Sequence, residues 1–119
     1  MEEKVTRFKM TKIKSKKTEE RELDNMWKKK VKDRDKWMCQ ICRKKVTGKN
    51  CHAHHILPKR IRGMRWDVDN GITLCYQHHK VGNYSPHMNA IWFFGWMNEN
   101  KPTQLRYIIS KLNQFGKSI

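Results

Sequence analysis

Three of the four cysteines and one histidine occur as two closely spaced pairs that could bind a metal ion. Cys39 and Cys42 form a Cys-x-x-Cys sequence, and Cys75 and His78 form a Cys-x-x-His sequence. Three thiolates and one imidazole are an accepted tetrahedral ligand set for structural zinc. The two pairs are further apart than those of a simple zinc ribbon, so we expect another structural unit between them.

The fourth cysteine, Cys51, lies outside this pattern. Exchanging it for His78 would give an all-thiolate site, but Cys51 has no second ligand three residues away and falls in a predicted strand. We therefore predict that Cys51 is a thiol of the hydrophobic core. The alternative for the whole group is a set of buried thiols without metal and a histidine on the surface.

All six histidines fall between positions 52 and 87, which indicates a second site between the two ligand pairs. His54 and His55 are adjacent, and His79 directly follows the expected zinc ligand. Neighbouring side chains of a strand point to opposite faces. His54 and His55 can therefore enter one site only if the strand is bent, and otherwise one of them is structural. His52 is expected to be exposed or near a phosphate.

Short secondary-structure elements must position these residues. The sequence predicts a strand over residues 51–57, which ends at Pro58, and a second strand over residues 72–74. Residues 75–83 can form a short helix directly after the second strand. Two strands followed by a helix predict the α+β class, with a small ββα core.

Helices are predicted on both sides of this core. Residues 1–18 are dominated by Lys, Arg, Thr and Ser, which indicates a basic, flexible arm. Thr18 is the predicted N-cap of the next helix. The packing face of that helix consists of residues at helical spacing, namely Leu23, Met26, Trp27 and Val31.

Two more helices are predicted towards the C-terminus. Ser85 can cap, and Pro86 can begin, a helix that extends to Met97. Because that helix is apolar on nearly every side, we expect it to be the most buried element, with its aromatic residues in the core: Trp92, Phe93, Phe94 and Trp96. A last amphipathic helix is expected from Pro102 to Gly116, with one apolar stripe formed by Leu105, Ile108, Ile109, Leu112 and Phe115.

The composition favours a nucleic acid as partner. The 119 residues include 27 Lys and Arg against 11 Asp and Glu, a formal net charge of +16. Dispersed cations release condensed counterions when they meet phosphates. The sequence has no signal-peptide pattern and no apolar run near the ~20 residues that span a bilayer. We therefore expect an intracellular protein without a membrane partner, where cysteines bind metal more often than they form disulfides.

The combined pattern resembles the HNH nuclease family, also called the ββα-metal or His-Me finger proteins, in the zinc-bound form common in phages and mobile elements. The resemblance covers Leu23 to Met97 and rests on the two ligand pairs, His54-His55, Asn70, Leu74 and His79. It implies a metal-dependent DNA endonuclease that hydrolyses phosphodiester bonds, by nicking or by double-strand cleavage. Residues 19–100 would form the nuclease domain with its zinc site, and residues 101–119 a helix packed on it.

The resemblance also implies a role for each matching residue. His55 would be the general base that takes a proton from the attacking water. Asn70 would have a structural role, in which it ties down the loop between the strands and holds His55 in orientation through its amide. His54 and His79 would bind a catalytic Mg2+ or another divalent cation such as Mn2+, apart from the structural Zn2+. The implied partner is DNA, contacted through its phosphates, and phage packaging proteins are further candidates.

The sequence departs from the commonest HNH pattern at two positions. His78 stands where a fourth cysteine is usual, a conservative change for zinc. Asn83 stands where many relatives have another cation-binding histidine, so either Asn83 or His87 can be the third ligand, and we favour His87.

The basic loop between the predicted strands offers candidate phosphate contacts. These are Lys59, Arg60, Arg62 and Arg65, and a solvated loop is the alternative. Two other functions remain open at this point: a zinc-stabilised DNA-binding module without catalysis, and a nuclease that acts on RNA or branched DNA.

Overall fold

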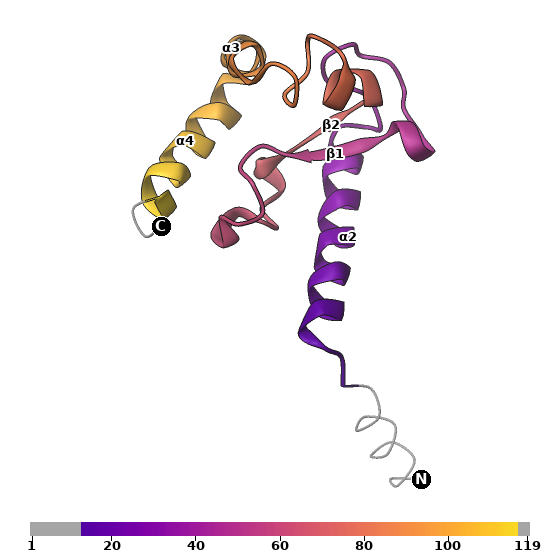
Figure 1. Cartoon of the computed structure of the whole chain (residues 1–119), viewed down its shortest axis with the longest axis vertical. Helices are drawn as coiled ribbons and strands as arrows, with labels where there is room; N and C mark the ends of the chain where they lie inside the picture. Colours follow the sequence, from indigo (N-terminus) through magenta and orange to yellow (C-terminus); the bar gives the residue numbers. More distant parts are fainter. Residues whose placement is uncertain (1–12, 117–119) are drawn as a thin grey trace, which may run out of the picture.

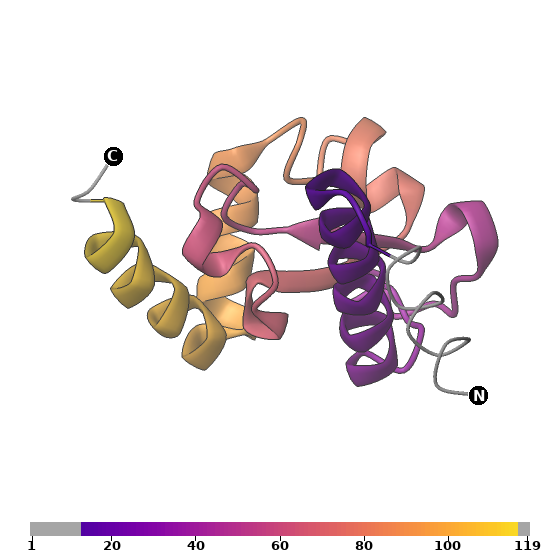
Figure 2. The same cartoon turned by 90° about the horizontal axis from the view of Figure 1, so that it is seen from below.

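The structure is a computed structural model that describes residues 13–116, so most of the predicted basic arm lies outside the described residues. Its longer elements are α2 (Lys16–Arg34), β1 (His52–His55), β2 (Gly71–Leu74), α3 (Ala90–Asn100) and α4 (Pro102–Gly116). The two strands run between α2 and the pair formed by α3 and α4 (Figures 1 and 2). This arrangement confirms the predicted α+β class.

The two predicted strands form a small antiparallel sheet. His52 of β1 lies opposite Leu74 of β2, and His55 lies opposite Gly71. The chain then enters a single wide helical turn, Gln77–Val81, with the hydrogen-bond pattern of a π-helix. The predicted helix over residues 75–83 is therefore one turn, and it carries His78 and His79.

The helix α2 begins earlier than predicted. Ser15, and not Thr18, is its N-cap, and the Ser15 hydroxyl oxygen accepts a hydrogen bond from the Thr18 backbone N–H at 3.1 Å. The two hydroxyl groups also hydrogen bond to each other at 2.9 Å. Capping at the earlier of two suitable residues adds most of a turn, so residues 16–18 are helical.

The buried face of α2 also differs from the predicted one. Trp27 and Val31 are buried as expected, but Leu23 and Met26 are 40% and 54% exposed. The buried face instead continues to Asp24, three residues before Trp27. A charged residue can occupy this position because an arginine from the loop between the strands pairs with it.

The helix α3 begins later than predicted. Asn89 is its N-cap and accepts a hydrogen bond from the Trp92 N–H at 3.0 Å. Ser85 is fully buried in the preceding turn, where its hydroxyl donates to the Gly82 carbonyl at 2.6 Å. Ser85 thus stabilises the turn, and Pro86 lies before the helix.

The expectation that α3 is the most buried element is wrong. Phe93 and Met97 are buried, but Ile91 and Phe94 are 87% and 55% exposed. Only one side of α3 faces the core, because α4 follows it directly and turns away at Lys101 (Figure 1). The predicted helix from Pro102 is confirmed as α4.

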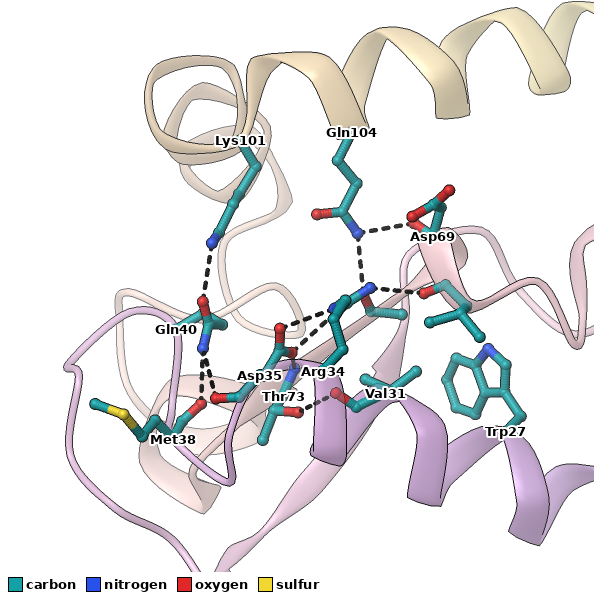
Figure 3. Close-up of polar contacts among 12 residues, drawn as sticks. Trp27, Val31, Arg34, Asp35, Met38, Gln40, Asp69, Thr73, Lys101 and Gln104 are labelled. Atoms are coloured by element: carbon teal, nitrogen blue, oxygen red, sulfur yellow. Dashed lines mark hydrogen bonds and ion pairs between the residues drawn. The ribbon is translucent and has the colours of Figure 1, made fainter.

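Polar contacts join the ends of α2 and α4 to β2 (Figure 3). Arg34 of α2 donates to the Gly71 carbonyl at 2.7 Å, and Gln104 of α4 donates to the same oxygen at 3.0 Å. The neighbouring Asp35 accepts a hydrogen bond from the Thr73 N–H at 2.8 Å. The strand that leads into the histidine-bearing turn is therefore fixed from both helices.

Candidate metal centres and catalytic site

The four predicted zinc ligands lie together at one end of the sheet. Cys39, Cys42, Cys75 and His78 form a cluster, called here the Cys3His cluster, whose ligand atoms all lie within 4.8 Å of one another. His78 Nδ1 lies 3.2 Å from Cys75 Sγ and 3.9 Å from Cys39 Sγ. Sulfur and nitrogen ligands of a tetrahedral zinc ion are about 3.6 Å apart. The residues present therefore fit a zinc ion.

A tight turn presents the first two sulfur atoms. The Arg43 N–H donates to the Cys39 carbonyl at 2.8 Å, and Arg43 has a left-handed φ of 65° that closes the turn. Burial raises the pKa of the Cys39 thiol, but backbone hydrogen bonds from Cys42, Cys75 and Ile41 leave it lowered overall. Such donors favour the thiolate, which is the form that binds zinc.

Cys51 lies outside this cluster, as predicted. Its side chain is 5% exposed within the hydrophobic core, and burial raises the pKa of its thiol. A protonated thiol surrounded by apolar side chains is a poor metal ligand.

Three further imidazoles form a second cluster, called here the histidine cluster, which consists of His54, His79 and His87. His79 Nε2 lies 3.1 Å from His54 Nδ1 and 3.1 Å from His87 Nε2. Metal-bound nitrogen atoms at right angles to each other, each about 2.1 Å from the ion, are about 3.0 Å apart. The donor set and its spacing therefore fit a divalent cation.

Electrostatics keep the imidazoles of His54 and His79 neutral near pH 7. Burial, followed by repulsion from the neighbouring histidines, lowers the pKa of His54 to about 3 and that of His79 to about 3. Only the neutral ring has a free lone pair for a metal ion.

His54 and His55 reach one site without a bend in the strand. His54 extends towards His79 and His87, whereas His55 stacks on Trp27 of α2, with ring centroids 3.7 Å apart and the planes 8° from parallel. Both imidazoles nevertheless line one cavity of about 400 Å³ at the end of β1. Ordinary alternation along the strand thus places His54, which belongs to the histidine cluster, and His55, which does not, on opposite sides of the strand.

His55 is oriented by a backbone carbonyl. Its Nε2 lies 2.9 Å from the Arg65 carbonyl oxygen, which can only accept a hydrogen bond. The hydrogen of the neutral ring is therefore on Nε2, and the lone pair is on Nδ1. Burial is the largest effect on this group and lowers the pKa of His55.

The Asn70 amide bonds to the backbone of the loop between the strands, and among the described residues it makes no hydrogen bond to His55. Its Oδ1 accepts a hydrogen bond from the Leu57 N–H at 2.6 Å, and its Nδ2 donates to the carbonyls of Leu57 and Met64 at 3.0 Å each. Asn70 is fully buried and closes the loop between the strands. It thus acts on His55 through the loop that carries Arg65.

The cationic residues around the cavity are only partly the predicted ones. Lys59 lines the cavity, together with Lys28 of α2 and Lys80 of the helical turn, which the sequence analysis missed. Arg65 had been predicted to contact phosphate, but its guanidinium donates to both carboxylate oxygens of Asp24, at 3.0 and 2.7 Å. Its side chain is only 14% exposed.

The remaining two predicted phosphate contacts, Arg62 and Arg60, lie in different surroundings. Arg62 pairs with Glu20 at 2.6 Å, although its side chain is 53% exposed. Arg60 is exposed. The charge partners of this loop, Glu20 and Asp24, lie on α2, 35 to 45 residues earlier in the chain, so the sequence spacing gave no indication of them.

His52 has a contact that the sequence analysis did not anticipate. It was expected to be exposed or near a phosphate; it is partly buried, and its Nδ1 lies 2.7 Å from His79 Nδ1. The signal was present in the sequence, because alternate residues of a strand share a face and His52 is two positions from His54.

Comparison with known proteins finds a similarity to one family within this part of the chain. The family model described as HNH endonuclease matches residues 39–83. The matched segment, less than half of the 119 residues, is similar to an HNH domain. The match includes the Cys3His cluster and the three histidines of β1, and it ends before His87.

This similarity suggests a nuclease-type function. No curated protein and no solved structure matched the chain. None of the helices within residues 13–116 is long and apolar enough to cross a membrane.

Proposed function

We propose that this protein is a metal-dependent endonuclease that hydrolyses phosphodiester bonds in DNA. The observation that carries the proposal is the shared cavity, in which the histidine cluster and the separate, oriented His55 lie side by side. The imidazoles of the histidine cluster can bind a cation while the imidazole of His55 exchanges a proton.

His55 would act as the general base. Its Nδ1 carries the lone pair and accepts a proton from a water molecule, whose oxygen forms a bond to phosphorus as the bond to the leaving oxygen breaks. The Arg65 carbonyl retains the Nε2 hydrogen and stabilises the ring when it becomes positively charged. Stacking on Trp27 limits rotation of the ring.

His54, His79 and His87 would hold a divalent cation such as Mg2+ or Mn2+. When bound, this ion supplies positive charge that stabilises the scissile phosphate and the leaving oxygen. Zinc at the Cys3His cluster would fix the start of the turn Gln77–Val81, and with it the position of His79.

DNA is the proposed substrate because lysines surround the cavity. Lys28, Lys59 and Lys80 line it together with the histidines. Their ammonium groups can contact phosphates on either side of the scissile bond without reading bases. The net charge of +16 extends this attraction over the whole molecule.

A plasmid-nicking assay with Mg2+ or Mn2+ tests the proposal. Wild-type protein should convert supercoiled plasmid to nicked or linear DNA, and His55→Ala should lower the rate at least about 100-fold. Equal rates in the two proteins would contradict the role of His55. DNA binding without any cleavage by the wild type would support the non-catalytic binding module, and competition with RNA and branched DNA would reveal another substrate.

The third cation ligand can be tested with a matched pair of variants. His87→Ala should weaken Mn2+ binding, measured by calorimetry on protein that holds one zinc ion, because His87 Nε2 is within the histidine cluster. Asn83→Ala should bind Mn2+ like the wild type. The reverse result would assign the ligand to Asn83.

A further inference from the structure

His52 contacts His79 on the side of the ring that faces away from the histidine cluster. His52 Nδ1 lies 2.7 Å from His79 Nδ1, and His52 Nε2 lies 2.8 Å from the Lys49 carbonyl oxygen. Lys49 belongs to the short helical turn Gly48–Asn50 that precedes β1. Three groups therefore form a chain that ends at the proposed cation site.

The hydrogen positions along this chain follow from elementary chemistry. The Lys49 carbonyl can only accept, so His52 Nε2 must donate to it. A neutral His52 then has its lone pair on Nδ1 and accepts a hydrogen bond. His79 Nδ1 must be the donor, and the lone pair of His79 is left on Nε2.

The lone pair of His79 thus faces the nitrogen atoms that would share a cation with it. His79 Nε2 is the atom that lies 3.1 Å from both His54 Nδ1 and His87 Nε2. The opposite form of the ring would direct an N–H group at the cation. A metal-binding histidine generally donates its other ring N–H to a neighbouring acceptor, and loss of that acceptor weakens metal binding.

We propose that His52 is a positioning residue that fixes the tautomer and the orientation of His79 for cation binding. This inference rests on the proposed function of the histidine cluster as a cation site. The strand provides the geometry, because His52 and His54 lie on one face of β1 and contact opposite edges of the His79 ring. The ring centroids of His52 and His54 each lie 4.9 Å from the ring centroid of His79, with interplanar angles of 83° and 68°.

The tautomer can be measured in the wild-type protein without any variant. Histidine side chains labelled with 15N give different nitrogen shifts and couplings for the two tautomers. In protein that holds one zinc ion and no second metal, we expect the hydrogen of His79 on Nδ1 and that of His52 on Nε2. A His79 ring with its hydrogen on Nε2 would overturn the inference.

A variant series separates hydrogen bonding from packing. His52→Ala removes the acceptor and should raise the Mn2+ dissociation constant about 10- to 100-fold. His52→Asn places an amide oxygen near the position of Nδ1 and should restore binding to within about threefold of the wild type. Equal losses in both variants would overturn the inference.

Tyr76→Leu is the matched control. The Tyr76 ring packs edge-on against His52, at 5.9 Å between centroids, and makes no contact with His79 in the described hydrogen bonds. The Mn2+ affinity of the Tyr76→Leu variant should be unchanged, and a loss of affinity as large as that of His52→Ala would overturn the inference. Zinc content and circular dichroism identify any variant that fails to fold. Absence of Mn2+ binding by the wild type would instead contradict the proposed cation site, and the tautomer measurement would still decide the role of His52.

Discussion

His55 is held by a carbonyl oxygen whose own residue is fixed by an ion pair. The Arg65 backbone accepts the hydrogen bond from His55, and the Arg65 side chain donates to both oxygens of Asp24. The hydrogen bond from Arg65 has the largest effect on the pKa of Asp24. Together with the hydrogen bond from Trp66 it outweighs burial, which raises the pKa, and the pKa is lowered to about 2. The charge on Asp24 therefore supports the proposed base although the two side chains are not in contact.

Asp24→Asn should reduce both stability and cleavage. The substitution leaves the largely buried Arg65 guanidinium without its charged partner, so we expect the free energy of unfolding to fall by about 1–3 kcal/mol. Denaturant unfolding followed by circular dichroism measures this change. The control is Asp33→Asn, which breaks the exposed pair with Lys29 and should cost under about 1 kcal/mol. Equal effects of the two substitutions would contradict the structural role of Asp24.

Individual site residues could be predicted where their relation is local in the chain. The zinc ligands follow from spacings of three residues, and His54, His55 and His79 from adjacency to each other or to those ligands. The partner of Arg65 could not be assigned in this way, and for His52 the strand pattern indicated the face that it shares with His54 but not its contact with His79. Their partners, Asp24 and His79, lie 41 and 27 residues away, and only the packing of α2 and the turn after β2 brings them together.

At the level of elements, β2 and α2 are in contact at Gly71. A Cβ atom there would lie 2.5 Å from Val31 Cγ2 and 2.6 Å from Trp27 Cζ2, and both side chains are buried. Gly71 also lies opposite His55 in the sheet. A glycine at this position therefore allows the helix to approach the strand closely enough for Trp27 to stack on the proposed base.

Gly71→Ala should destabilise the protein by about 1–3 kcal/mol, because an added methyl group in this contact forces the helix away from the sheet. Thermal unfolding measures the effect. Gly95→Ala is the control, since a Cβ at this position of α3 has no neighbour within 4 Å. That variant should be unchanged or up to about 1 kcal/mol more stable. A neutral Gly71→Ala would show that α2 and β2 are less closely packed.

The sequence predicted which helices and strands are present better than it predicted where each one begins and which of its sides is buried. Both strands and α4 were predicted close to their observed positions. The start of α2 differed because two hydroxyl residues, Ser15 and Thr18, were equally suitable caps. The burial of α3 was overestimated because an apolar composition does not reveal which side has a neighbour, and Phe94 is exposed.

The whole molecule combines a small core with two clusters of metal-binding side chains at the sheet. The Cys3His cluster joins the turn that follows α2 to the turn that follows β2, and α3 and α4 lie at the other end of the strands (Figure 2). Structural zinc contributes directly to folding in domains of this size. Stability and the geometry of the histidine cluster should therefore depend on the same ion.

Cys42→Ser should abolish stoichiometric zinc binding and the cooperative unfolding transition. Zinc content by mass spectrometry of the native protein and the circular dichroism melting curve measure the two effects. Cys51→Ser replaces a buried cysteine outside the Cys3His cluster and should keep one zinc per chain. A Cys42→Ser protein that melts like the wild type without zinc would contradict the structural role of the metal.

The most direct test of the proposed site is a crystal of the protein soaked in Mn2+ and measured at the zinc and manganese absorption edges. We predict a zinc peak among Cys39, Cys42, Cys75 and His78 and a manganese peak bounded by His54 Nδ1, His79 Nε2 and His87 Nε2. A manganese peak elsewhere, or none at Mn2+ concentrations that support cleavage, would contradict the assignment of these three histidines as the cation site.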